Sequence, residues 1–301
     1  MSESVIRLEH IQKNYGKSKV LLDVNLEIEK GCIYGLIGKN GSGKTTIFKV
    51  ILGLTAFNGG NIHIGDEKDT LSQGRSKIGF YVGQNFFTYM TARENLEYYR
   101  VLKNVKDKSE IDRVLKLVGL DGVAKRKAGK FSLGMKQRLG IAMAMVGNPE
   151  IILLDEPMNG LDPQGIIDIR NIILDLNKNR NITFVISSHL LDELSKVATH
   201  YGFISDGRLI REISAEEIKK DGNTTTTVVT PDTVKLAVLL DSMKLQYEIK
   251  SSSEAVVFAQ LDLEEFMPQA KEAGIEINSL TVNSESLENV YLNIMGNKEN
   301  C

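Results

Sequence analysis

The sequence predicts an α/β domain followed by a smaller α+β domain. Apolar strand segments alternate with helical segments over residues 1–220, which is typical of α/β proteins. One of these strands runs directly into a glycine-rich loop and then into a helix. Near Asp221-Gly222-Asn223 the character of the chain changes and a run of four threonines begins. We therefore expect one domain at residues 1–220 and a second at 223–301.

The composition fits a soluble protein with a sizeable core. The chain has 301 residues, 42% of them hydrophobic, and a formal net charge of −2. This balance gives no electrostatic reason to expect nucleic acid or an anionic bilayer as the main partner. Its two cysteines, Cys32 and Cys301, form neither a disulfide framework nor a metal-ligand spacing. The N-terminus lacks a secretion-signal pattern, and no apolar run approaches the roughly 18 residues of a spanning helix. If the protein works at a membrane, we expect another chain to supply the spanning part.

Short apolar runs at the start of the first domain predict strands. The expected strands are Val5–Leu8, Val20–Leu22, Leu26–Ile28, Cys32–Ile37, Asn61–Ile64 and Ile78–Val82, with a turn at Tyr15-Gly16-Lys17. A helix is expected from Thr45 to about Leu52, directly after the glycine-rich loop.

The middle of the chain predicts an all-helical insert, roughly from 85 to 150. Helical periodicity runs from Ala92 to about Val118 and again from Met135 to Val146, where Gly147-Asn148-Pro149 ends it. Two fully apolar segments follow, Ile151–Leu154 and Thr183–Ser187, of the kind that is buried on both faces of a parallel sheet. A helix from Gly165 to about Asn177 is expected between them.

The second domain predicts the element order βαββαβ plus a last helix, which is the ferredoxin-like split-βαβ arrangement. The expected elements are Thr225–Val229, Pro231–Met243, Gln246–Lys250, Ala255–Gln260, Leu263–Ala273, Glu276–Val282 and Ser286–Met295.

The glycine-rich loop satisfies the phosphate-binding pattern G-x-x-x-x-G-K-[ST]. Its residues are Gly38-Lys39-Asn40-Gly41-Ser42-Gly43-Lys44-Thr45. The glycines let backbone N–H groups point inward around phosphate oxygens, at the N-terminus of a helix. Lys44 can neutralise the β- and γ-phosphates, and the Thr45 hydroxyl can ligate Mg²⁺. A chance match in a flexible loop is the alternative, which the flanking strand and helix disfavour. We expect ATP to contact Gly38, Asn40, Gly41, Ser42, Gly43, Lys44, Thr45 and Thr46.

A second motif places two carboxylates, Asp155 and Glu156, at the end of the apolar strand Ile151–Leu154. ATP hydrolysis needs one acid near Mg²⁺ and another that positions or activates water. Asp155 suits the first role and Glu156 the second. The alternative is that both merely cap the strand before the turn at Pro157, and the phosphate-binding loop upstream disfavours that interpretation.

The segment 131–138, Phe-Ser-Leu-Gly-Met-Lys-Gln-Arg, resembles the signature motif of ATP-binding cassette (ABC) ATPases. Other motifs of that family are matched by Tyr15 (adenine stacking), Gln84 (the glutamine loop, also a Mg²⁺ ligand), Asn159-Gly160-Leu161-Asp162 (the D-loop) and His189 (the switch histidine). Taken alone, Tyr15 could be a turn residue and His189 a satisfied polar group. The resemblance covers residues 1 to about 220 and implies a phosphate-binding-loop ATPase fold with a mixed sheet and a helical subdomain.

The resemblance also implies how the site works. Two copies of the chain would form a head-to-tail sandwich, in which Ser132 and Gly134 of one copy complete the ATP site on the other. Asp162 would also contact nucleotide, and His189 would contact the γ-phosphate. The implied catalytic residues are then Glu156, His189 and Lys44, and the implied Mg²⁺ ligands are Thr45, Gln84 and Asp155.

Several positions depart from the commonest pattern of the family. Phe131, Leu133 and Met135 occupy places in the usual signature Leu-Ser-Gly-Gly-Gln, whereas Ser132 and Gly134 are kept. In the D-loop, Asn159-Gly160 replaces Ser-Ala, and Met158 replaces the usual threonine before it. We expect these changes to affect communication between the two ATP sites more than the chemistry.

Longer phrases at 131–142, 159–166, 186–194 and 287–292 resemble the bacitracin-export and lantibiotic-immunity branch of bacterial transporters. That resemblance implies an ATP-hydrolysing subunit of an exporter for an antimicrobial peptide or drug. It would lie in the cytoplasm, bound to the inner face of the membrane through permease subunits. The segment 85–100, with Phe86, Phe87 and Tyr89, would dock the permease or else pack the subdomain core. Residues 223–301 would hold or regulate the dimer.

Two other functions remain as alternatives. An ABC-type ATPase that acts on nucleic acid or ribosomes usually carries two fused cassettes, a long coiled coil, zinc modules or a basic arm, and this sequence has one phosphate-binding loop and none of those additions. A regulatory subunit without hydrolysis is disfavoured by the presence of both Glu156 and His189.

Overall fold

The computed structural model describes residues 3–66, 68–83, 86–221, 225–259, 261–283 and 287–296. Contacts divide the chain into two compact units, Met1–Ala215 and Glu216–Cys301. Among the described residues, no helix combines the length and the apolar character that a membrane span needs.

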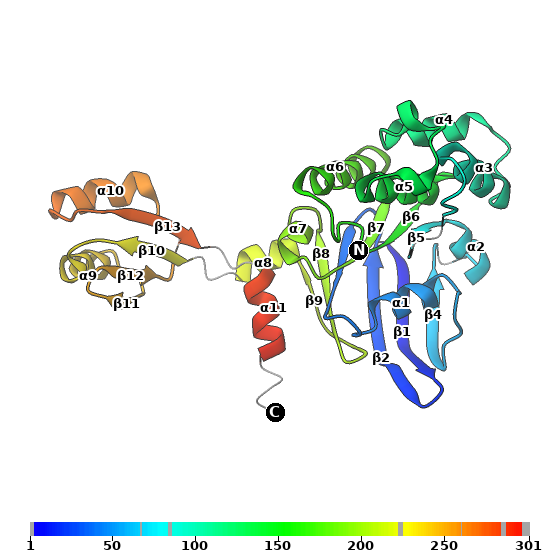
Figure 1. The fold of residues 1–301 in the computed structure, drawn as a ribbon. Helices are drawn as coiled ribbons and strands as arrows, with labels where there is room; N and C mark the ends of the chain where they lie inside the picture. The colour runs from blue at the N-terminus through cyan, green and yellow to red at the C-terminus, as the bar shows by residue number, and fades with distance from the viewer. Residues whose placement is uncertain are drawn as a thin grey trace. The chain divides into compact units, whose positions relative to one another are not determined.

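The first unit is built on a nine-stranded sheet in the order β4-β1-β2-β9-β8-β3-β7-β6-β5 (Figure 1). Its strands are β1 (Ser4–Tyr15), β2 (Ser18–Glu29), β3 (Ile33–Ile37), β4 (Gly59–Ile64), β5 (Ile78–Tyr81), β6 (Ile151–Asp155), β7 (Thr183–Ser188), β8 (His200–Ser205) and β9 (Arg208–Ser214). Strands β5, β6, β7, β3 and β8 run parallel, whereas β1 is antiparallel to β2 and β4. The predicted α/β fold with a mixed sheet is therefore confirmed.

The central strands β3 and β7 are buried along their whole length. This burial explains their continuous apolar sequence, because a parallel strand covered by helices exposes neither face. Strands β6, β7 and β3 are neighbours, so their carboxyl ends meet at one edge of the sheet. The glycine-rich loop, the two carboxylates and the segment around His189 all follow these ends.

Helices fill the connections between the strands (Figure 1). They are α1 (Lys44–Ile51), α2 (Leu71–Ser76), α3 (Ala92–Leu102), α4 (Ser109–Leu117), α5 (Leu133–Met145), α6 (Pro163–Arg180) and α7 (Leu191–Ser195), with short 3₁₀ turns at Asp121–Val123 and Ala128–Lys130; α8 (Ala215–Asp221) spans the boundary between the units. The described residues between β5 and β6 contain helices and turns and no named strand, as expected for the insert. The helical pattern expected from Ala92 to about Val118 is present as two helices, α3 and α4, with Asn104 in a left-handed backbone conformation (φ 54°) between them.

Two further expectations need correction. The short strands expected before residue 30 are two long strands, β1 and β2, whose pairing shifts register near His10, a residue with φ 54°. The irregularity ends the apolar alternation of β1 after Leu8, so only its first part was expected, and the two segments expected at Val20–Leu22 and Leu26–Ile28 both belong to β2. The hairpin of β8 and β9 was not predicted, although Phe203 and Ile204 in β8 are fully buried.

The helix after the glycine-rich loop is anchored by its apolar side. Ile47, Phe48, Val50 and Ile51 are fully buried in the core that also contains Leu36 of β3. Burying one such side chain contributes about 1.5–3 kcal/mol, so four of them hold α1 firmly against the sheet. The start of α1, where Lys44 and Thr45 lie, is fixed as a consequence.

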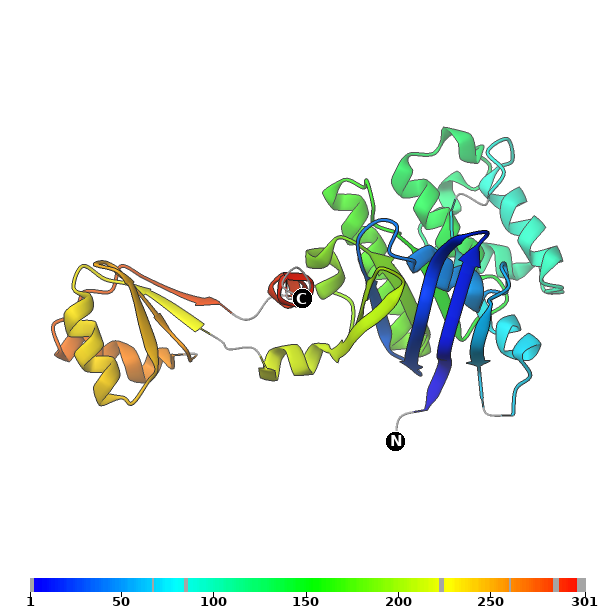
Figure 2. The same ribbon diagram turned by 90° about the horizontal axis from the view of Figure 1, so that it is seen from below.

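The second unit has its own sheet and core. Its elements are β10 (Thr225–Val229), α9 (Thr233–Ser242), β11 (Tyr247–Ser251), β12 (Glu254–Val257), α10 (Leu263–Glu272), β13 (Ser279–Asn283) and α11 (Leu287–Gly296). The antiparallel sheet has the order β11-β12-β10-β13, which is that of a split βαβ arrangement. Leu236 and Leu240 of α9 and Phe266 of α10 bury against Val228 of β10, so both helices cover the same face of the sheet (Figure 2).

Candidate functional site

The glycine-rich loop bends tightly between β3 and α1. Gly43, at the N-cap of α1, has φ 114°, a conformation that residues with a side chain rarely adopt. At Gly38 a Cβ atom would stand 2.4 Å from the carbonyl oxygen of Ile204, so a side chain has no room there. The loop therefore needs glycine at both positions to present its N–H groups at the start of the helix, where an anion is favoured.

Lys44 is buried within this loop. Its Nζ donates hydrogen bonds to the carbonyl oxygens of Gly38 (2.6 Å) and Lys39 (3.2 Å), and it lies 3.6 Å from Oε1 of Glu156. The buried Oγ of Ser42 has no hydrogen-bond partner among the described residues. A buried cation beside an unsatisfied hydroxyl suits phosphate oxygens, which accept hydrogen bonds and carry negative charge.

Asp155 is held at both of its carboxylate oxygens. Thr45 Oγ1 donates to Oδ2 (2.9 Å), and Ser187 Oγ donates to Oδ1 (2.5 Å). Hydroxyl and carboxylate oxygens are the ligands that Mg²⁺ prefers, so Thr45 and Asp155 fit the predicted cation site. The third expected ligand, Gln84, lies outside the described residues.

Glu156 has a strained backbone and a tightly held side chain. Its φ is 51°, in the left-handed region, and its N–H donates to both Oγ (3.0 Å) and the carbonyl oxygen (3.1 Å) of Ser187. Its Oε2 lies 2.8 Å from Nδ1 of His189, and its buried Oε1 makes no hydrogen bond within the described part of the chain. Strain of this kind is kept where surrounding contacts fix it, often in active sites. The three predicted catalytic residues, Lys44, Glu156 and His189, are thus brought together.

Ser187 was missed by the sequence interpretation. It is fully buried in β7, and its hydroxyl joins the Asp155 carboxylate to the Glu156 backbone. The only signal in the sequence was a polar residue near the end of an otherwise apolar strand. Its role depends on the pairing of Asp155 with Ser187 across β6 and β7, which no local pattern gives.

Four other residues predicted to contact ATP lie in the loop, in α1 and at the end of β1. Asn40 and Gly41 are exposed at the tip of the loop, and Thr46 is half-buried in α1. Tyr15 ends β1 with 46% of its surface exposed, and Lys13 Nζ lies 4.5 Å from the centre of its ring. An exposed ring is available for stacking, and the contact with adenine stays a prediction.

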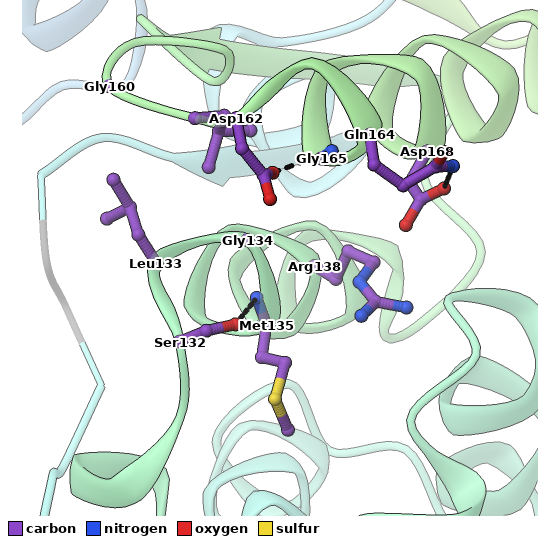
Figure 3. A pocket seen from close by; sticks show the side chains of 11 residues that line it. Ser132, Leu133, Gly134, Met135, Arg138, Gly160, Asp162, Gln164, Gly165 and Asp168 are labelled. Atoms are coloured by element: carbon purple, nitrogen blue, oxygen red, sulfur yellow. Dashed lines mark hydrogen bonds between the residues drawn. The ribbon is translucent and has the colours of Figure 1, made fainter.

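The signature and D-loop residues form a separate pocket of about 320 Å³ between the starts of α5 and α6 (Figure 3). Ser132 caps α5 by accepting a hydrogen bond from Met135 N (3.3 Å), and Asp162 caps α6 by accepting one from Gly165 N (2.9 Å). Ser132, Gly134 and Asp162 all line this pocket, whereas no residue of the glycine-rich loop is among its described lining. The predicted site residues therefore fall into two groups within one chain.

Comparisons with known proteins show the family to which the chain belongs. Residues 21–159 match the family model of the ABC transporter. The chain is 36% identical to the bacitracin transport ATP-binding protein BcrA of Bacillus licheniformis, over 97% of this chain and 98% of that protein. It is 39% identical to the lantibiotic transport ATP-binding protein SrtF of Streptococcus pyogenes, over 69% of this chain and 90% of that protein. A solved dimeric ATP-binding cassette in a post-hydrolysis state, bound to ADP and phosphate, superimposes with a TM-score of 0.62 at 28% identity, covering 70% of this chain and 98% of that one. The chain therefore belongs to the ABC transporter family, as an ATP-binding subunit that hydrolyses ATP.

Proposed function

We propose that this chain drives a bacterial exporter of antimicrobial peptides or drugs, and that two copies close head to tail around two ATP molecules. The observation that carries the proposal is the separation of the site into two groups. Lys44, Asp155 and Glu156 can hold a triphosphate and activate the water that attacks it, yet Ser132 and Gly134 line a different pocket of the same chain. If the second copy of the chain supplies Ser132 and Gly134, both groups of residues contact the same ATP molecule. The dimeric cassette reported above supports this pairing.

We propose a separate task for each residue of the site. Lys44 and the N–H groups of the glycine-rich loop bind the β- and γ-phosphates. Glu156 orients the attacking water and accepts a proton from it. His189, whose Nδ1 lies 2.8 Å from the Glu156 carboxylate, holds that carboxylate in its orientation. Thr45 and Asp155 would hold Mg²⁺, which neutralises charge on the phosphate oxygens when it is bound.

The helical insert exposes aromatic and aliphatic side chains. Tyr89, Tyr98, Val101 and Leu102 are 66%, 45%, 62% and 66% exposed. The ring of Phe87 packs against that of Tyr89 in a tilted arrangement and against that of Tyr98 edge to face, with ring centres 5.7 and 5.1 Å away. Phe86 is buried, so it packs the core of the insert instead. An aromatic and aliphatic surface of this kind suits a protein partner. We assign it to the permease, which would place the chain at the cytoplasmic face of the membrane.

The names of the relatives support the choice of cargo. One is named for bacitracin transport and covers nearly the whole chain, including the second unit, and another is named for lantibiotic transport. Both are transport proteins, so the alternative of an ATPase acting on nucleic acid is not proposed. The second unit would hold or regulate the dimer, and a chain ending at residue 222 would then pair more weakly than the full chain.

The deciding experiment compares Glu156→Gln and Lys44→Ala with the unaltered chain. Glu156→Gln should bind ATP, form a dimer with Mg²⁺ and ATP, and lose turnover, because the amide cannot take a proton. Lys44→Ala should fail to bind nucleotide. Glu150→Gln, the same change just before the other end of β6, serves as the control and should retain turnover. Normal hydrolysis by Glu156→Gln, or a Glu156→Gln chain that stays monomeric with Mg²⁺ and ATP, would show the proposal to be wrong.

A further inference from the structure

The net charge of the helical insert differs in sign from that of the rest of the chain. Residues 82–150, which join β5 to β6, contain 13 lysines and arginines and 7 aspartates and glutamates. The remainder of the chain contains 24 and 32 of them. The formal charge of the insert is therefore +6, although that of the whole chain is −2. Such an asymmetry indicates a region that meets an anionic partner, which the overall balance conceals.

Four cations of the insert lie close together in the segment 125–130, here called the basic segment, and none has a carboxylate partner. All four are exposed and form no ion pair among the described residues: Lys125, Arg126, Lys127 and Lys130. The arginines of α3 and α4, by contrast, are paired with acids of the same two helices, as Arg93–Asp112, Arg100–Glu97 and Arg113–Glu110. Much of the unbalanced charge of the insert is therefore concentrated in the basic segment.

Backbone hydrogen bonds hold the basic segment beside an exposed aromatic residue. Ala128 N donates to the carbonyl oxygen of Met90 (2.8 Å), and Gly129 N donates to that of Thr88 (2.8 Å). Tyr89, between these two acceptors, is 66% exposed. Exposed cations next to an exposed aromatic ring are typical of proteins that lie on an anionic membrane, where the ring enters the interface and the cations meet lipid phosphates.

We propose that the basic segment binds anionic phospholipid headgroups of the membrane, beside the permease. The inference rests on the proposed function for the membrane itself, whereas the charge and exposure of the segment do not depend on it. Three of the four cations are lysines, which carry a compact charge on a flexible stem and are depleted at protein–protein interfaces, where arginine is enriched. A fluid layer of phosphates therefore fits the segment better than an acidic protein surface does.

The test measures flotation of the full chain with phosphatidylcholine vesicles that contain either no phosphatidylglycerol or about 30% of it. The unaltered chain should float with the anionic vesicles at about 0.05 M salt, and much less at about 0.5 M, because salt screens the attraction. It should not float with the neutral vesicles.

The triple variant Lys125→Gln, Lys127→Gln and Lys130→Gln should lower the partition coefficient about hundredfold, since each cation near an anionic surface contributes about fivefold. Arg126 is kept because its guanidinium donates to the carbonyl oxygen of Lys130 at 2.6 Å. Both the triple variant and the unaltered chain should hydrolyse ATP equally well in solution.

A matched control removes the same charge outside the insert. It neutralises three exposed lysines that likewise form no ion pair in the described part of the chain, by Lys68→Gln, Lys178→Gln and Lys271→Gln. Because only the total charge changes and the basic segment stays intact, this variant should float as the unaltered chain does.

Fluorescence gives a second readout, because the chain contains no tryptophan. Tyr89→Trp places a single indole beside the basic segment, and its emission should shift to shorter wavelength when anionic vesicles are added. Phe258→Trp, at an aromatic residue of the second unit that is 46% exposed, should show no shift.

Three results would overturn this inference: flotation that does not depend on phosphatidylglycerol, a triple variant that floats like the unaltered chain, or an unaltered chain that does not float with the anionic vesicles. If, in the last case, the triple variant also fails to co-purify with co-expressed permease subunits, the segment binds an acidic protein surface instead. None of these results affects the ATP-dependent pairing of Glu156→Gln, which tests the proposed function separately.

Discussion

Replacing Ser187 by alanine removes the hydroxyl that links the two carboxylate residues of the site. That hydroxyl donates to Asp155 Oδ1 at 2.5 Å and accepts from Glu156 N at 3.0 Å, inside a fully buried strand. A bond to a carboxylate contributes about 1.5–3 kcal/mol and a neutral one about 0.5–1.5 kcal/mol. We expect Ser187→Ala to lower the free energy of unfolding by about 2–4 kcal/mol.

The same change should slow hydrolysis. Glu156 keeps its left-handed backbone only because its surroundings fix it, and Ser187 Oγ is one of two acceptors of its N–H. If about 1.4–2.8 kcal/mol of the loss falls on the reacting geometry, turnover drops about tenfold to a hundredfold. ATP affinity should change little, because Lys44 and its loop make no hydrogen bond to Ser187 among the described contacts.

Denaturant unfolding and steady-state ATP hydrolysis measure the two effects separately. Thr183→Val is the matched control at the other end of β7, where the Thr183 hydroxyl accepts a bond from Gly31 N at 2.8 Å. It should cost about 1 kcal/mol of stability and leave turnover unchanged. Equal turnover in Ser187→Ala and Thr183→Val, under conditions where both are folded, would refute the argument.

Two further predictions concern parts of the molecule away from the chemistry. A Cβ at Gly202 would stand 2.0 Å from the hydroxyl oxygen of buried Tyr34; Gly202→Ala should therefore lower the free energy of unfolding by about 1–3 kcal/mol, whereas Gly122→Ala, with open space around it, should not. Burial lowers the pKa of Lys103 from 10.5 to about 8, and its Nζ donates to the carbonyl oxygen of Val146 at 2.9 Å. Between these two pKa values the unfolded chain holds a proton that the folded chain has lost, so stability from this group rises with pH. From pH 8 to 10 the unaltered chain should gain about 2 kcal/mol of unfolding free energy relative to Lys103→Met. A difference between the two chains that does not change with pH in denaturant titrations would contradict the assignment.

Local chemistry made much of the molecule predictable. The glycine-rich loop, the pair Asp155-Glu156 and each buried strand are short continuous stretches of sequence. Each of them has a residue pattern that is typical of one kind of structure. The sequence therefore indicated the fold, and it named Lys44, Glu156 and His189, which the structure brings within hydrogen-bond or ion-pair distance.

Features that depend on pairing between distant segments were not predictable in this way. Ser187 acquires its role only because β7 lies beside β6. The segments 88–93 and 124–130 lie side by side although they are far apart along the chain. Strand β8 was not predicted. It lies beside β3 in the sheet because of pairing between segments far apart in the sequence, which the residues of β8 alone do not indicate.

The helical insert leaves the sheet at Tyr81 and returns at Ile151, on the strand next to it. Since the exit and the re-entry belong to two paired strands, changes confined to α3 and α4 need not alter the alignment of the other strands. Helix α5 is different, because its residues 139–145 are buried and a Cβ at Gly140 would stand 2.5 Å from the ring of Tyr81 in β5. The exposed side chains of α3 that we assign to the permease thus lie in the part of the excursion that these strand pairings constrain least. Substitutions on this surface would then change the membrane partner while the sheet and the ATP site keep their structure.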